Sequence, residues 1–135
     1  MTLHRLASIG GLVALLVGCG LFDSGVIWRG GPYVLGWIDE SENVTLSYEL
    51  GRGHSIGRIE RCVFAVGWDG RYLVAKQHPE CNRKITAYYF IDSKKDSDLA
   101  ELQNVVVGPL TEAEFRREAV ERNLPEFSKE LAALK

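Results

Sequence analysis

The sequence has no apolar run long enough to cross a lipid bilayer. A membrane-spanning helix needs roughly 20 apolar residues, and the N-terminal apolar run covers only residues 6–17. The chain also has no excess of basic residues, because 16 Lys and Arg stand against 18 Asp and Glu, a formal net charge of −2. Since nucleic-acid binding relies on a patch of positive charge, this composition argues against a nucleic-acid partner.

The sequence also lacks a phosphate-binding loop. Gly51, Gly53 and Gly57 form a G-x-G-x-x-x-G pattern after a predicted strand. A phosphate loop must run directly into the N-terminus of a helix, whereas residues 59–68 are predicted to form a strand. We therefore expect a flexible hairpin connection here and no nucleotide ligand.

No motif of metal-dependent or nucleophilic catalysis is present. His78, Glu80 and Cys81 resemble the H-x-E motif of zinc deaminases, but the P-C-x-x-C segment of that motif is missing. A zinc site built from His54, His78, Cys62 and Cys81 would compete with a disulfide. We predict no catalytic residue, no metal and no cofactor other than a covalent lipid, and so no enzyme. The alternative is an enzyme site assembled from His54, His78 and nearby carboxylates.

What the N-terminus does contain is a short export signal. Arg5 precedes the apolar run, and Leu16, Val17, Gly18 and Cys19 close it. These four residues resemble the lipobox of bacterial lipoproteins, which implies cleavage before Cys19 and attachment of fatty acyl chains such as palmitate to that cysteine. The alternative is an ordinary secretory signal. We expect a signal peptide over 1–18, the lipidated Cys19 with a short tether over 19–31, and one globular domain over 32–135.

The lipobox also implies a location. Two or more acyl chains anchor a protein stably in a membrane, so membrane lipid is the first expected partner, through Cys19. Residue 20 is Gly rather than Asp, which by resemblance to sorted Gram-negative lipoproteins favours the outer membrane, facing the periplasm. In a Gram-positive cell the protein would stay on the outer face of the plasma membrane. Either way we predict a cell-envelope protein.

The remaining two cysteines, Cys62 and Cys81, are predicted to form a disulfide. Assigning Cys19 to lipid leaves them as a pair in an oxidising compartment, and the hairpin described next puts both at the same end of the sheet. The alternative is two reduced, buried thiols.

The domain is predicted to be α+β and mainly β. Apolar runs alternate with turn signals every 8 to 12 residues, which is typical of antiparallel strands. Asp69-Gly70 favours a two-residue type I′ hairpin with Val66 opposite Leu73. Both faces of this hairpin are apolar, so the sheet must be covered twice, by helices or by curling into a barrel or sandwich. The strands are expected at residues 33–38, 44–50, 59–68, 71–77, 85–92 and 104–107.

The C-terminal residues are predicted to form one or two helices over 111–134. Thr111 and Glu114 make a capping box, and the helix that they begin is expected to stop near Asn123. Pro125 is expected to start a second helix, whose apolar stripe contains Leu124, Phe127, Leu131 and Leu134. The expected fold is an antiparallel meander sheet of five or six strands with these helices on one face. The run SKKDSD at 93–98 is expected to be a solvated loop.

Three segments, VFAVGWDGRYLVAKQHP, YYFIDS and VVGPLTEAEF, resemble a family of short, uncharacterised bacterial lipoproteins. The resemblance covers residues 59–120. Each motif residue has a structural explanation, so the resemblance implies a fold and transfers no activity. The motif residues are Asp69, Gly70, Tyr72, Asp92, Gly108, Pro109, Leu110 and Phe115.

The functional expectation is therefore a membrane-anchored, non-catalytic binding module. Its partner would be another protein or an envelope component, and a narrower hypothesis is an immunity or inhibitor lipoprotein, because small acidic β domains suit blocking a cationic active site. The alternatives are a structural subunit of an envelope assembly, docked by the C-terminal helices, and the dispersed enzyme site named above.

Overall fold

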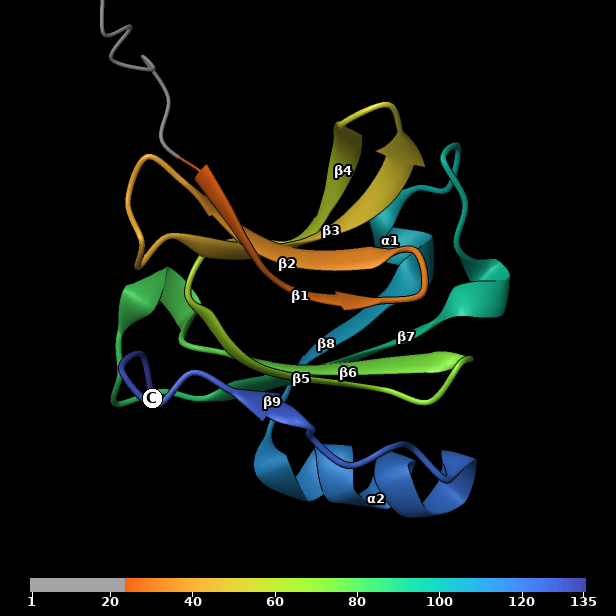
Figure 1. The fold of residues 1–135 in the computed structure, drawn as a ribbon. Coiled ribbons are helices and arrows are strands. Elements are labelled where there is room, and N and C mark those ends of the chain that lie inside the picture. The colour runs from red at the N-terminus through yellow and green to blue at the C-terminus, as the bar shows by residue number, and fades with distance from the viewer. Residues whose placement is uncertain (1–23) are drawn as a thin grey trace, which may run out of the picture.

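The domain is a sandwich of two antiparallel sheets (Figure 1). A computed structural model describes residues 24–135, so Leu16, Val17, Gly18 and Cys19 lie outside the described residues. The first sheet is a meander of four strands in chain order: β1 (Ser24–Gly30), β2 (Tyr33–Ile38), β3 (Val44–Gly51) and β4 (His54–Ile59).

The second sheet has five strands in the order β8-β7-β6-β5-β9. A helix of the C-terminal region packs on its outer face, and three shorter helical segments lie in its connections. The strands are β5 (Val63–Trp68), β6 (Tyr72–Gln77), β7 (Ala87–Asp92), β8 (Val106–Leu110) and β9 (Lys129–Glu130), and the helical segments are η1 (Pro79–Cys81), η2 (Ser93–Lys95), α1 (Leu102–Val105) and α2 (Glu112–Arg122).

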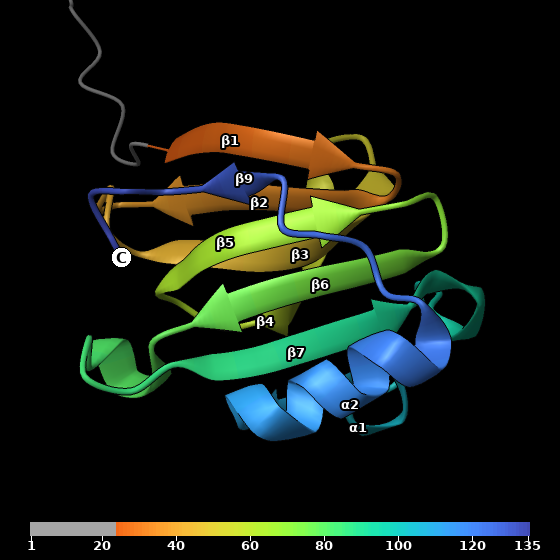
Figure 2. The same cartoon turned by 90° about the horizontal axis from the view of Figure 1, so that it is seen from below.

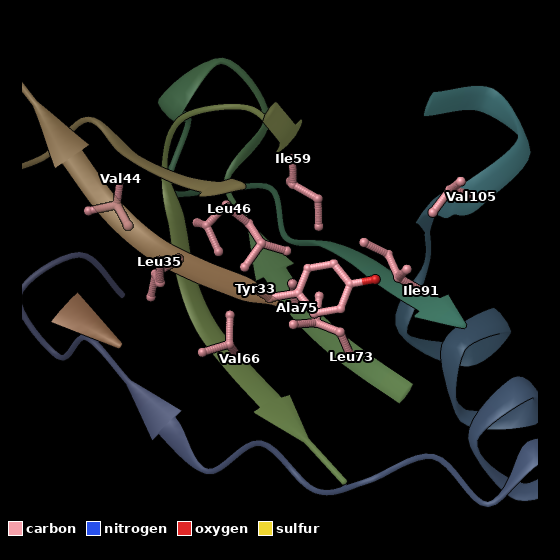
Figure 3. Packing of buried hydrophobic residues seen from close by; sticks show 11 residues of the cluster. Tyr33, Leu35, Val44, Leu46, Ile59, Val66, Leu73, Ala75, Ile91 and Val105 are labelled. Carbon is pink, nitrogen blue, oxygen red and sulfur yellow. The ribbon is translucent and has the colours of Figure 1, made fainter. Parts of the chain in front are cut away.

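The main core lies between the two sheets (Figure 3). Strands expose alternate side chains on opposite faces, so each sheet contributes every second residue to this layer. The fully buried side chains come from both sheets and include Tyr33, Leu35, Val44 and Leu46 from the first sheet, and Val63, Val66, Leu73 and Ile91 from the second. The inner face of the second sheet is thus covered by the first sheet. The apolar faces of the hairpin had predicted a cover either by helices or by further sheet.

The outer face of the second sheet is covered by α2 and the segment after it (Figures 1 and 2). Phe115 of α2 lies with its ring centroid 5.1 Å from Tyr88 and 5.6 Å from Phe127. The predicted capping box is present, because Thr111 Oγ1 accepts from Glu114 N and the Glu114 carboxylate accepts from Thr111 N. The helix ends at Asn123, which caps it with φ +55°. The mainly β antiparallel fold with a C-terminal helix on one face is confirmed.

The second C-terminal helix is not formed. After Pro125 the chain runs alongside the edge of β5, where Ser128 N donates to Val66 O and Leu131 N donates to Phe64 O. A Cβ atom on Gly67 would lie 2.1 Å from the carbonyl oxygen of Glu126, so the missing side chain allows this close approach. Pairing with a free strand edge therefore outweighs the helical pattern of the apolar residues.

Three further expectations on strand placement are corrected. The expected tether contains β1 from Ser24 to Gly30. The predicted strand over 59–68 is divided, because Cys62 has a φ of +67° and the chain crosses there from the first sheet to the second. The short strand expected at 104–107 begins only at Val106, where α1 ends.

The hairpin between β5 and β6 has a longer loop than predicted. Val66 pairs with Ala75 rather than Leu73, and the last pair before the loop is Trp68 with Leu73. Asp69 explains the shift, because its Oδ1 accepts from the backbone N–H groups of both Arg71 and Tyr72, at 2.8 and 2.7 Å. This side-chain bonding widens the turn.

Candidate functional site

A cavity of about 480 Å³ lies at one open side of the sandwich. It is bounded by β4 and β8, the edge strands of the two sheets, and by α1. We call it the edge cleft. Its walls are mainly apolar, and it is lined by Gly57, Arg58, Ile59, Glu60, Gln77, Tyr89, Leu102, Gln103, Val106, Gly108 and Pro109.

A chain of hydrogen bonds fixes the polar floor of the edge cleft. Gln77 is buried, and its Nε2 donates to Glu60 O at 2.9 Å and to Arg61 O at 3.1 Å. The Tyr89 hydroxyl in turn donates to Gln77 Oε1 at 2.7 Å. Burial, and after it the charge of Glu60, raises the pKa of Tyr89 above its usual value.

Arg58, another lining residue of the edge cleft, forms a buried ion pair with Asp96. Arg58 Nη2 is 2.7 Å from Asp96 Oδ1, and the exposed fractions of the two side chains are 1% and 0%. Arg58 also donates from Nε to Asp96 Oδ2 at 3.1 Å and from Nη2 to Ser97 O at 3.0 Å. The Tyr33 hydroxyl donates to Asp96 Oδ2 at 2.9 Å, and burial, then this hydrogen bond, raises the pKa of Tyr33. The pair ties the first sheet to the segment after β7.

A β-bulge turns Arg58 inward. Ser47 pairs with Gly57 and Leu46 pairs with Ile59, so Arg58 is an extra residue on β4. Such an insertion breaks the alternation of faces, and as a result Arg58 and its neighbour Ile59 are both buried. No local sequence pattern predicts this bulge.

The run at 93–98 is not simply a solvated loop, which corrects the expectation. The side chain of Asp96 is buried, and Asp92 caps η2, its Oδ1 accepting from Lys94 N. Asp92 also pairs with Arg71 Nη2 at 3.0 Å. The hydrogen bond from Arg71 is the main reason that the pKa of Asp92 lies below its usual value.

The disulfide between Cys62 and Cys81 is present, with the two Cα atoms 5.3 Å apart. The cysteines lie at the same end of the second sheet, as expected, where β5 begins and η1 ends. His78 packs beside them. Its ring stacks on Phe64 with centroids 4.2 Å apart, and its Nδ1 lies 2.8 Å from Ile85 O, whereas its buried Nε2 has no partner.

The structure does not bring the two candidate histidines into one described site. His54 is exposed at the start of β4 in the first sheet, whereas His78 is buried beside the disulfide after β6. Within residues 24–135 no group of three or more His, Cys, Asp or Glu side chains is arranged to hold a metal ion. In the same part of the chain, no helix is long and apolar enough to span a membrane.

The residues of the family pattern have structural positions. Asp69 forms the hairpin loop, Asp92 caps η2 and Phe115 anchors α2. Gly108 has a φ of +140°, and a Cβ atom there would lie 2.5 Å from the Tyr89 ring, so glycine allows β8 to approach the floor of the edge cleft. The cleft residues Arg58, Gln77 and Tyr89, and the Asp96 partner of Arg58, were not singled out from the sequence.

Comparison with known proteins gives one match. Residues 31–132 match the family model described as "Protein of unknown function (DUF3997)". No curated protein and no solved structure matches the chain significantly. The matched segment spans nearly the whole sandwich, from the turn after β1 to the residues that follow β9. The chain therefore belongs to the DUF3997 family of proteins of unknown function.

Proposed function

We propose that this protein is a bacterial envelope lipoprotein, anchored through acylated Cys19, whose sandwich binds another protein or an envelope component without catalysing a reaction. The edge cleft is the observation that carries the binding role. Its polar side chains, the buried Gln77 and the half-buried Tyr89, are held by hydrogen bonds within the protein. A cleft with mostly apolar walls and a few fixed polar groups is the usual form of a binding site.

Two features support the anchored location. β1 begins at Ser24, five positions after Cys19, and five extended residues reach at most about 18 Å. An acyl chain on Cys19 would therefore hold the sandwich next to the bilayer surface. The disulfide between Cys62 and Cys81 fits an exported protein, because such bonds persist in oxidising compartments.

An immunity or inhibitor role is the narrower candidate within this class. The chain has a net charge of −2, and the acidic residue Glu60 lines the edge cleft, both of which suit a cationic partner. The alternative of a structural subunit docked by the C-terminal apolar stripe is less favoured. Leu124 and Phe127 pack on the outer face of the second sheet, and Leu131 and Leu134 pack against the main core.

The anchor is tested by fractionating cells that express the wild-type protein or Cys19→Ser. We expect the wild-type chain to lose residues 1–18 and to sediment with membranes, and we expect Cys19→Ser to lose the membrane association. Globomycin should cause accumulation of the uncleaved precursor. A wild-type protein found in the cytosol with residues 1–18 retained would refute the envelope assignment.

The binding role is tested by crosslinking in intact cells, followed by pull-down from detergent-solubilised membranes. We expect a discrete partner that is lost when the edge cleft is filled by Val106→Trp, and retained when the exposed Val120 of α2 is changed to Trp. If both variants retain the partner, the partner binds to another surface of the domain. For an immunity role, the gene should lie beside that of a toxin, and its deletion should sensitise the cell.

A further inference from the structure

The edge cleft offers hydrogen-bond acceptors to a ligand, because the donors of Gln77 and Tyr89 and most of those of Arg58 are already used within the protein. Arg58 donates to Asp96 and to backbone carbonyls, and Gln77 donates to two carbonyl oxygens. The Tyr89 hydrogen is directed at Gln77, and Gln103 Nε2 donates to Glu101. One hydrogen of Gln103 Nε2 stays free, whereas the Tyr89 oxygen and the Glu60 carboxylate keep lone pairs that can accept, so a ligand that brings donors is complementary to these two groups.

The uncompensated charge at the edge cleft is negative. The Arg58 cation is neutralised by Asp96 at 2.7 Å. Glu60 forms no ion pair with any residue of the described range 24–135. Glu60 is exposed, and its charge acts on the half-buried Tyr89 hydroxyl. This combination favours a cationic ligand, because hydrogen bonds to charged groups are the stronger ones.

The walls accept an aliphatic chain. The apolar part of the lining includes Ile59, Leu102, Val106, Pro109 and Tyr89, and Leu102 is 49% exposed. Lysine and arginine place a charged head on an apolar stem of three or four methylene groups. Such a side chain matches both the apolar walls and the acceptors.

The position of the cleft favours a side chain that is carried by a polypeptide. β4 is the outermost strand of the first sheet and has only β3 as a hydrogen-bonded neighbour. At Gly57, which lines the cleft, a Cβ atom would meet nothing within 4 Å. An edge strand offers unpaired backbone groups to an extended chain. Across the cleft, Pro109 of β8 has no backbone N–H group to donate to an extended chain, which leaves β4 as the strand along which such a chain would lie.

We propose that the edge cleft receives a lysine or arginine side chain from an extended segment of a partner protein, with its cation at Glu60 and Tyr89. This inference deepens the binding role proposed above and rests on it. It assigns the recognised feature to one basic residue, with the flanking backbone of the partner lying along β4.

The experiment is a selection of displayed random heptapeptides on the detergent-solubilised mature protein, followed by calorimetry with the peptides obtained. We expect peptides with a basic residue at one fixed position and β-branched neighbours. Glu60→Gln should weaken their binding about tenfold, as should norleucine in place of the basic residue. The matched control is Glu121→Gln, an exposed carboxylate on α2, which should leave the affinity unchanged.

Amide NMR shifts on binding should be confined to Gly57, Tyr89, Gly108 and their neighbours. The inference would be overturned if no peptide is recovered or if the peptides show no preference for a basic residue. It would also be overturned if they bind Glu60→Gln as tightly as the wild-type protein, or if the amide shifts change elsewhere in the domain. Binding of spermidine as tight as that of the peptides would assign the cleft to free amines and refute the polypeptide ligand. If the inference fails while the pull-down still yields a partner, the binding role itself survives.

Discussion

The buried pair of Arg58 and Asp96 makes the sharpest stability prediction. Changing Asp96 to Ala removes the anion and leaves the Arg58 guanidinium, with a side-chain exposed fraction of 1%, without a counter-charge. It also removes the acceptor of the Tyr33 hydroxyl. Removing one partner of a buried pair costs about 3–5 kcal/mol, because the remaining charge stays desolvated. Since a domain is stable by about 5–15 kcal/mol, this is a large fraction of the total.

The double variant Arg58→Met with Asp96→Leu should cost less than Asp96→Ala alone. It removes both charges together and replaces them with apolar side chains of similar size, an exchange that is often close to neutral. The exposed pair of Arg116 and Glu112 provides the matched control, because its side chains are 75% and 58% exposed. Losing that pair should cost no more than about 0.5 kcal/mol.

The assay is urea unfolding at neutral pH, followed by tryptophan fluorescence, with the disulfide intact in every variant. We expect the midpoint to fall strongly for Asp96→Ala, less for the double variant and hardly at all for Glu112→Ala. If Asp96→Ala lowers the free energy of unfolding by less than about 1 kcal/mol, the reasoning is refuted, because a buried cation without a counter-charge should destabilise the fold by more than that. A double variant less stable than the single one would also contradict it.

Three further predictions concern the disulfide, the C-terminal strand and acid stability. Reduction, or Cys81→Ser, should lower the free energy of unfolding by roughly 3 kcal/mol, because the bridge closes a loop with a sequence separation of 19; an unchanged melting temperature would contradict this. Gly67→Ala should displace the segment at Glu126, since the new Cβ would lie 2.1 Å from its oxygen, and hydrogen exchange should show faster exchange in β9 and unchanged protection in β2. The pKa of Asp92 is lowered in the folded protein, so its contribution to stability is present above about pH 4 and is lost as the pH falls through the native pKa. Arg71→Ala should therefore make the stability less dependent on pH in this acid range. Urea unfolding at a series of pH values measures this dependence.

Much of the local structure could be predicted from the sequence. The start and end of α2 follow from Thr111, Glu114 and Asn123, because capping depends on residues a few positions apart. The disulfide followed from the count of cysteines. The mainly β class followed from the spacing of apolar runs and turns. Each of these signals is local, or depends on composition alone.

Long-range contacts decided the rest. The positive φ of Cys62 divides one predicted strand between two sheets, and the bare backbone of Gly67 lets the C-terminus join β5 as a strand. The edge cleft exists because the bulge at Arg58 and the approach of β8 at Gly108 bring distant segments together. The sequence by itself determined the mainly β class, the limits of α2 and the candidate disulfide pair Cys62 and Cys81. Only the tertiary structure decided which edges remain free and which charges are buried, because these depend on backbone hydrogen bonds and packing between residues far apart in the chain.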